Sequence, residues 1–152
     1  MNRKFTKVRY IKTNIGTRDD RTTCYLKFGI SLEKLPFGYC LEALEGFNSI
    51  IKDFNIETCE LSNDEGDIWY EDFIVGESLG YAYCNPDDIN DPIIGERIAM
   101  TSAQQAAYER VTKLYDDIQT LFINYANKYD ELAENTSYAM ESCKEHINEI
   151  VK

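Results

Sequence analysis

The last third of the chain contains neither glycine nor proline, and this most constrains its fold. No proline follows Pro92 and no glycine follows Gly95, as far as Lys152. Because these two residue types interrupt helices most strongly, the segment can form one long helix. We therefore expect residues 80–103 to join a strand-forming half of the chain to a helical half.

The helical half carries an apolar stripe with a seven-residue period. Its two rows are Val111, Ile118, Tyr125, Leu132 and Ala139, and Tyr115, Phe122, Tyr129, Thr136, Cys143 and Ile150. This period is typical of a helix that packs along another helix. We expect Thr101 or Ser102 to cap the helix. A straight helix of ~50 residues would be about 75 Å long, which exceeds a compact domain of this size. The helix therefore either stays long and packs against another subunit, or breaks near Asn135; we favour the break, together with some contact between subunits.

The first half of the chain has the pattern of an antiparallel sheet. Alternating, β-branched and aromatic residues predict strands over 4–15, 21–30, 56–62, 67–75 and 79–84. Asn63, Asp64, Glu65 and Gly66 form a typical hairpin-turn sequence between two of these strands.

Helical spacing of apolar residues predicts one helix over 39–54, which Gly46 weakens. The expected fold class is α+β: an N-terminal antiparallel sheet with one packed helix, followed by a long C-terminal helix or helical hairpin. We expect a single domain over 1–152, made of sheet and helix (1–84), a turn segment (85–100) and a helical segment (101–152).

Several classes of protein fit the sequence poorly. No apolar run is long enough to cross a bilayer, and no apolar segment follows the basic residues at the start, so we expect a cytoplasmic protein. The five cysteines are widely spread and the chain has one histidine, His146, which argues against a zinc site and favours reduced thiols.

No motif of an enzyme or cofactor-binding protein is present. The sequence lacks GxSxG, a P-loop and GxGxxG, and His146 lies beside charged residues near the end of the helical half. The acidic segment that begins at Asn85 departs from a calcium loop, because Asn90 stands where an EF-hand needs glycine. We therefore expect no enzymatic activity, no metal and no cofactor.

Charge is divided unevenly along the chain. Residues 1–27 contain eight Lys or Arg against two acids, whereas residues 53–97 contain thirteen acids and Arg97 as the one cation. Such a division can arise because the two segments pair as neighbouring strands. It can also mark an acidic surface for a basic partner. Since the net charge of the chain is −11, direct binding of nucleic acid is not expected.

The acidic segment predicts the binding surface. Its carboxylates can occupy a basic groove built for DNA or RNA, with their oxygens where phosphate oxygens would lie. The residues expected to contact the partner are Asp64, Glu65, Asp67, Glu71, Asp72, Asp87, Asp88 and Asp91.

One segment is similar to a pattern found in small phage-encoded proteins. The matching positions are Gly80, Ala82, Cys84, Asn85, Pro86, Asp88, Ile94, Gly95, Ile98, Ala99 and Ala103. Asn90 stands where that pattern has an aromatic residue, and Ser102 where it has an arginine. Proteins with this segment weakly resemble the anti-Thoeris sponges, which bind cyclic nucleotide-derived immune signals. The resemblance implies a phage-type anti-defence protein that acts by binding in the bacterial cytoplasm.

Three functions remain open. The first is an anti-CRISPR-like inhibitor that binds the basic surface of a bacterial defence protein or nucleic-acid enzyme stoichiometrically. The second is a sponge for a cyclic nucleotide signal. The third is a structural or assembly protein that forms homo-oligomers through the C-terminal helix. For the sponge, the expected ligand-binding residues are Tyr81, Tyr83, Asn85, Asp88, Arg97 and Ser102.

Overall fold

The computed structural model describes residues 7–13, 15, 20–83 and 92–152. The chain divides into two compact units, Met1–Tyr115 and Asp116–Lys152. The expected segment boundaries at 84/85 and 100/101 do not coincide with this division. The reason is that the first part of the long helix packs on the sheet and belongs to the first unit.

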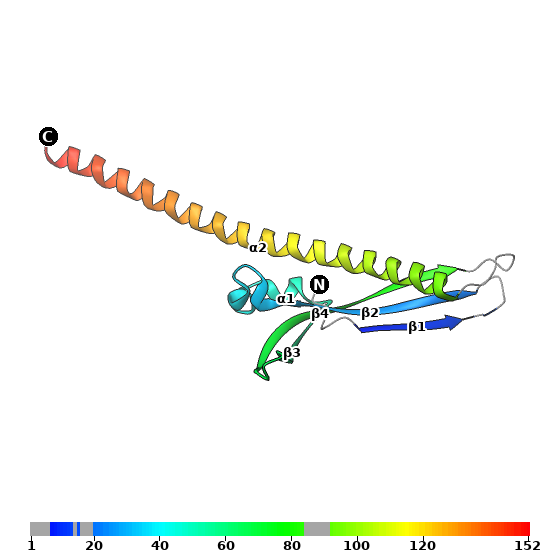
Figure 1. The fold of residues 1–152 in the computed structure, drawn as a ribbon. Helices are drawn as coiled ribbons and strands as arrows, with labels where there is room; N and C mark the ends of the chain where they lie inside the picture. Colours follow the sequence, from blue (N-terminus) through cyan, green and yellow to red (C-terminus); the bar gives the residue numbers. More distant parts are fainter. Residues whose placement is uncertain (1–6, 14, 16–19, 84–91) are drawn as a thin grey trace. The chain divides into compact units, whose positions relative to one another are not determined.

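Four antiparallel strands form one sheet in the first unit (Figure 1). They are β1 (Lys7–Thr13), β2 (Arg21–Ser31), β3 (Asn55–Ser62) and β4 (Ile68–Tyr83), in the order β1-β2-β4-β3. The two strands expected over 67–75 and 79–84 are one strand. Gly76, at the expected interruption, lies opposite Phe28, and a Cβ there would be 2.7 Å from the Phe28 ring. Gly76 therefore makes room for an aromatic ring and does not form a turn.

The connection between β2 and β3 is irregular, and the expectation of one helix over 39–54 is wrong. This connection contains the 3₁₀ helices η2 (Leu32–Lys34) and η3 (Gly38–Ala43) and the short helix α1 (Phe47–Ile50). Gly46 lies between η3 and α1 with a φ of 95°, a left-handed conformation that favours glycine and ends helical geometry. The apolar spacing is still used, because Leu41, Phe47 and Ile51 are buried.

The long helix α2 comprises Pro92–Ile150. It begins nine residues before the expected cap at Thr101, with proline at the first position, where the missing N–H costs nothing. The Thr101 hydroxyl donates to the carbonyl of Arg97 at 2.9 Å, so it is satisfied inside the helix. The expected break near Asn135 is also wrong. The chain is helical there, and the Thr136 hydroxyl donates to the carbonyl of Leu132 at 2.8 Å.

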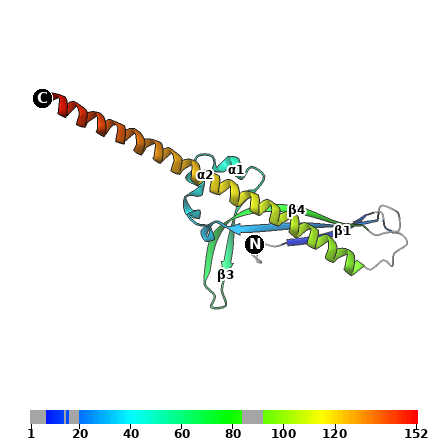
Figure 2. The same ribbon diagram turned by 90° about the horizontal axis from the view of Figure 1, so that it is seen from above.

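The first part of α2 covers one face of the sheet (Figure 2). Its contact residues, all buried, are Ala99, Ala103, Ala107, Val111 and Leu114. The Ser78 hydroxyl donates to the carbonyl of Ala103 at 2.7 Å, and a Cβ on Gly80 would lie 2.0 Å from the carbonyl oxygen of Ala99. Small residues on both elements therefore allow the helix backbone to lie directly on β4.

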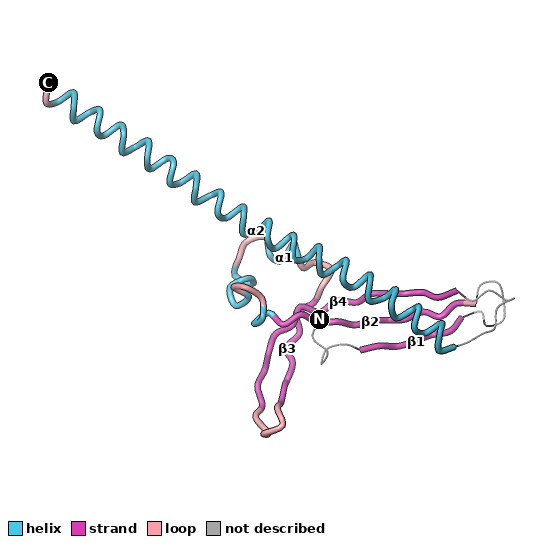
Figure 3. Tube along the Cα trace, turned by 45° about the horizontal axis from the view of Figure 1, so that its top comes forward, coloured by secondary structure: helices cyan, strands magenta, loops and turns pink. Residues whose placement is uncertain are grey.

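The second unit consists of the remainder of α2, which is helical as far as Ile150 (Figure 3). Ile118, Leu121, Phe122 and Tyr125 are partly exposed, and residues 126–152 are all exposed. The apolar stripe predicted from the sequence is thus present on a helix that has no second element beside it within its own unit.

Candidate functional site

The strongest candidate for a binding surface is the hairpin made by β3 and the first part of β4. We call residues 57–72 the acidic hairpin. β2 pairs with β4 over Phe73–Tyr83, whereas β3 pairs with Ile68–Val75. The outer part of the hairpin is therefore a two-stranded ribbon, visible in Figure 3 with its turn away from β1 and β2. It carries seven carboxylates and no lysine or arginine: Glu57, Glu60, Asp64, Glu65, Asp67, Glu71 and Asp72.

The turn of the acidic hairpin is held by one asparagine side chain, as its sequence predicts. Asn63 Oδ1 accepts hydrogen bonds from the backbone N–H groups of Glu65 and Asp67, each at 3.0 Å. Gly66 has a φ of 85°, and its N–H donates to the carbonyl of Asn63 at 3.2 Å. This turn brings three of the predicted contact residues, Asp64, Glu65 and Asp67, together at an exposed tip.

Two further predicted contact residues lie on opposite faces of the ribbon, because successive residues of a strand alternate. Glu71 accepts hydrogen bonds from the Ser31 hydroxyl and from Trp69 Nε1, both at 2.9 Å. Asp72 Oδ1 accepts a hydrogen bond from the Thr58 hydroxyl at 2.5 Å. Their neighbours thus hold these two carboxylates in defined orientations.

Sequence reasoning missed the exposed apolar residues of the acidic hairpin. Ile68 and Tyr70 are 61% and 63% exposed, and Trp69, the one tryptophan of the chain, is 37% exposed. The Tyr70 hydroxyl donates to Glu60 Oε2 at 3.1 Å. The signal was the run Ile-Trp-Tyr directly after the turn, which we had used only as evidence of a strand. Aromatic side chains are enriched at the centre of protein interfaces, and polar side chains surround them at the rim.

Four predicted residues cannot be placed. Asn85, Asp87, Asp88 and Asp91 lie outside the described residues.

Four of the residues expected to bind a cyclic nucleotide lie in the described part of the chain, on two sides of the sheet. Ser78 and Gly80 face α2, so the alternation of β4 places Tyr81 and Tyr83 on the opposite face. Arg97 and Ser102 belong to α2. The sheet therefore separates the two tyrosines from these two residues, and the expected ligand site is not formed by them together.

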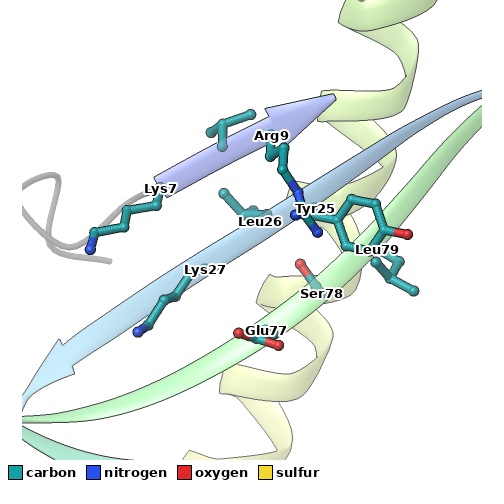
Figure 4. A pocket seen from close by; sticks show the side chains of 9 residues that line it. Lys7, Arg9, Tyr25, Leu26, Lys27, Glu77, Ser78 and Leu79 are labelled. Atoms are coloured by element: carbon teal, nitrogen blue, oxygen red, sulfur yellow. The ribbon is translucent and has the colours of Figure 1, made fainter. Parts of the chain in front are cut away.

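A second surface, the sheet face opposite α2, combines cations with tyrosine rings. Arg9 lies over the ring of Tyr25, with 4.6 Å between Cζ and the ring centroid, and Arg21 lies over Tyr81 at 5.0 Å. A shallow depression of about 610 Å³ lies beside the first pair (Figure 4). The side chains on this face that line it are Lys7, Arg9, Tyr25, Lys27, Glu77 and Leu79.

In the described part of the chain, an ion pair joins the basic segment to the acidic segment. Lys27 Nζ lies 3.1 Å from Glu57 Oε1, where β2 and β3 both flank β4. The alternative that the charge division reflects neighbouring strands thus holds for this pair. The explanation by neighbouring strands does not apply to the tip. Among the described residues, no lysine or arginine forms an ion pair with the three tip carboxylates.

Two groups with a raised pKa, the buried thiol of Cys24 and the more exposed phenol of Tyr10, lie on the face of the sheet that α2 covers. Burial raises the pKa of the Cys24 thiol, which contacts the sulfur of Met100 at 3.8 Å. The pKa of Tyr10 is also raised, first by desolvation and then by Cys24 and Glu96. Both shifts follow from packing against the helix.

The described cysteines, Cys24, Cys40, Cys59 and Cys143, are free thiols. Among the residues that the structure describes, no three His, Cys, Asp or Glu side chains are grouped so that they could hold a metal ion. In the same part of the chain, none of the helices has the length and apolar character required to span a bilayer. Comparison of the chain with protein-family models, curated proteins and solved structures gives no match.

Proposed function

We propose that this chain is a stoichiometric inhibitor that binds a basic groove of its partner through the acidic hairpin. The observation that carries this proposal is the exposed two-stranded ribbon with seven carboxylates, no cation of its own and an exposed Ile-Trp-Tyr run. The carboxylates supply charge complementarity and rapid association, and the aromatic residues supply the contact area that a purely charged surface lacks.

The order of the hairpin supports this function. The side chain of Asn63 fixes the turn, and neighbouring side chains orient Glu71 and Asp72. A surface that is already ordered loses little conformational entropy on binding. Carboxylate oxygens held along a narrow ribbon can therefore replace phosphate oxygens in a groove that normally holds DNA or RNA.

The partner class follows from this chemistry and from the resemblance to small phage-encoded proteins. A protein with a nucleic-acid groove offers the basic surface, and bacterial defence enzymes are the members of that class that a phage must inhibit. The proposal is thus an anti-CRISPR-like, anti-defence protein that acts as a nucleic-acid mimic.

The test is inhibition of purified bacterial defence nucleases by the full chain, followed by binding measurements from about 50 to about 300 mM salt. The test variant reverses the charge of the hairpin tip with Asp64→Lys, Glu65→Lys and Asp67→Lys. The control makes the same charge change in the second unit with Asp130→Lys, Glu131→Lys and Glu145→Lys. We expect the tip variant to bind at least about 100-fold more weakly and the control to bind within about threefold of the unmodified chain. Salt-independent binding, or equal loss in both variants, would contradict the proposal.

A second candidate function, the sponge, is favoured by the depression on the sheet face opposite α2. Its volume of about 610 Å³ lies within the range of small-ligand sites, and Lys7 and Arg9 provide positive charge beside the ring of Tyr25. We propose this face, in place of the separated residues, as the site for an anionic nucleotide signal.

The measurement for this candidate is equilibrium dialysis of the chain against cyclic nucleotides. Arg9→Ala is expected to weaken binding at least about tenfold, since it removes a charge and a cation over Tyr25. Lys52→Ala, an exposed lysine elsewhere, is the control. No retention of any cyclic nucleotide by the unmodified chain would eliminate this candidate.

A further inference from the structure

The second unit carries an apolar seam that is exposed from Tyr129 to Ile150. We define the seam as the residues that recur at alternating intervals of four and three along α2: Ile118, Phe122, Tyr125, Tyr129, Leu132, Thr136, Ala139, Cys143, His146 and Ile150. Tyr129, Leu132 and Ile150 are 72%, 60% and 68% exposed. The four-three alternation averages 3.5 residues, the spacing at which two helices keep one face in contact over many turns.

The flank of the seam extends the apolar face. The residues that directly follow Tyr125, Leu132, Ala139 and His146 of the seam are also apolar: Ala126, Ala133, Met140 and Ile147. On the side directly opposite the seam, the outermost position of each heptad is polar: Thr120, Asn127, Glu134, Glu141 and Asn148. The helix is therefore amphipathic over its full length in this unit, although no other element of the unit can use the apolar side.

The charges of the unit are placed away from the seam. Of its eight acids, only Glu149 borders the seam; the others occupy the outer positions of the heptad: Asp116, Asp117, Asp130, Glu131, Glu134, Glu141 and Glu145. Some outer side chains satisfy each other along the helix, with Lys144 Nζ 2.9 Å from Glu141 Oε1 and the Tyr138 hydroxyl donating to Glu134 at 3.2 Å.

This placement of charge identifies the occupant of the seam. Positions that border a coiled-coil seam normally select partners by charge, and here they are almost neutral. A second, equally acidic copy can therefore approach along the seam without like charges facing each other. Since helices of this kind depend on packing of the apolar face for most of their stability, a second copy also supplies what the isolated helix lacks.

The sizes of the seam residues identify the orientation. The seam residues from Phe122 to Leu132 are bulky, those from Thr136 to Cys143 are small, and His146 and Ile150 at its end are large again. In a parallel pair each residue would face its own copy, so that tyrosine would meet tyrosine and alanine would meet alanine. In an antiparallel pair Tyr125, Tyr129 and Leu132 meet Cys143, Ala139 and Thr136, so that a large residue faces a small one in the central layers of the seam.

We propose that two copies of this chain pair through the seam as an antiparallel coiled coil, independently of what the acidic hairpin binds. The register that uses every seam residue places the two-fold axis between Leu132 and Thr136. Its five independent layers, each of which occurs twice, pair Ile118 with Ile150, Phe122 with His146, Tyr125 with Cys143, Tyr129 with Ala139, and Leu132 with Thr136.

The first experiment measures the mass of the full chain in solution by light scattering and sedimentation equilibrium. We expect roughly twice the chain mass of 17.6 kDa. Tyr129→Glu combined with Leu132→Glu is expected to weaken association at least about tenfold and to lower helicity. Asn124→Glu combined with Asn127→Glu adds the same charges on the outer face and is expected to leave the dimer intact. Fluorescence of Trp69 reports whether the first unit, which contains the sheet (the sheet unit), remains folded in each variant.

The second experiment tests the orientation by disulfide formation under mild oxidation, with the linked peptides identified by mass spectrometry. Tyr125→Cys is expected to give a disulfide between the introduced thiol and Cys143 of the second copy. A monomer at about 100 μM, an assembly larger than two, or loss of association in the outer-face control overturns the seam dimer. A Cys143–Cys143 disulfide in the unmodified chain overturns the antiparallel arrangement.

Discussion

The two units use one helix in two different ways. In the sheet unit the buried positions of α2 are mostly alanine, spaced by four residues, and the helix lies on Ser78 and Gly80. In the second unit the seam positions alternate by four and three, include the large residues Phe122, Tyr125, Tyr129 and Leu132, and are exposed from Tyr129 onwards. Small residues allow the helix backbone to approach a sheet closely, whereas large residues can fill the wider space between two helices. The residue sizes along α2 therefore distinguish the part that packs within the chain from the part that requires a partner.

The strongest test of the covered part is Gly80→Ala. The added Cβ would lie 2.0 Å from the Ala99 carbonyl oxygen and 2.2 Å from the Ala103 nitrogen, both backbone atoms that cannot rotate away. We expect the free energy of unfolding in urea to fall by about 3 kcal/mol or more. Gly95→Ala is the matched control. Its Cβ would meet only Thr22 Oγ1 at 3.3 Å, and the helix gains up to about 1 kcal/mol from alanine. Equal losses in both variants would show that the helix does not lie on β4 as described.

A leucine-to-alanine pair compares the two parts directly. Leu114 is 2% exposed in the sheet unit, and Leu114→Ala is expected to cost about 3 kcal/mol at every protein concentration. Leu132 is 60% exposed, so Leu132→Ala is expected to cost less than about 0.5 kcal/mol in the dilute chain and to weaken self-association instead. Unfolding curves at two concentrations a hundredfold apart distinguish these outcomes. A concentration-independent loss at Leu132 would contradict the comparison.

Two cations on α2 give a smaller contrast. The Arg110 guanidinium donates to the carbonyls of Glu77 and Asp53, and it lies 4.7 Å from the ring centroid of Phe54. It thus ties α2 to β4 and to the residues before β3, and Arg110→Ala is expected to lower the free energy of unfolding by about 2 kcal/mol. Lys128 Nζ lies 5.3 Å from the ring centroid of Tyr125, an exposed contact within one helix. Lys128→Ala is therefore expected to change the free energy of unfolding by less than about 0.5 kcal/mol. Urea denaturation of both variants checks the difference.

The smallest effect concerns alkaline pH. Burial raises the pKa of the Cys24 thiol above its ordinary value of 9.0. The unfolded chain therefore ionises first, so this group's contribution to stability is complete below pH 9 and is lost as the pH rises through the folded pKa. In Cys24→Ala the melting temperature is expected to be lower at pH 7, because a packed thiol is removed, but to fall less steeply between pH 8 and pH 10. Parallel slopes for the two proteins would contradict this expectation.

Much of the architecture was predictable from local patterns. The strands, the turn at Asn63 and Gly66 and the long C-terminal helix follow from alternation, turn chemistry and the absence of glycine and proline after Gly95. The predictions failed where one residue type has two uses. Gly46 divides an expected helix, whereas Gly76 accommodates an aromatic ring inside a continuous strand, and sequence alone does not distinguish these uses.

The candidate site shows the same limit. The tip carboxylates were predictable, because Asp64, Glu65 and Asp67 surround a turn sequence that places them at an exposed end. The separation of Tyr81 from Arg97 was not, because it depends on which face of β4 the helix covers. The exposure of Trp69 was also missed, since it results from β2 ending its pairing with β4 at Phe73.

The sequence by itself determined the local elements, the charge division and the period of the helical stripe, since these depend on neighbouring residues and their spacing. Only the tertiary structure decided that Pro92 begins the helix, that no break follows at Asn135, and that the alanines lie on Ser78 and Gly80. It also decided that the seam is partly exposed from Ile118 to Tyr125 and exposed from Tyr129 to Ile150. The physical reason is that burial is a property of pairs of surfaces, and a stripe on one helix does not specify which surface covers it.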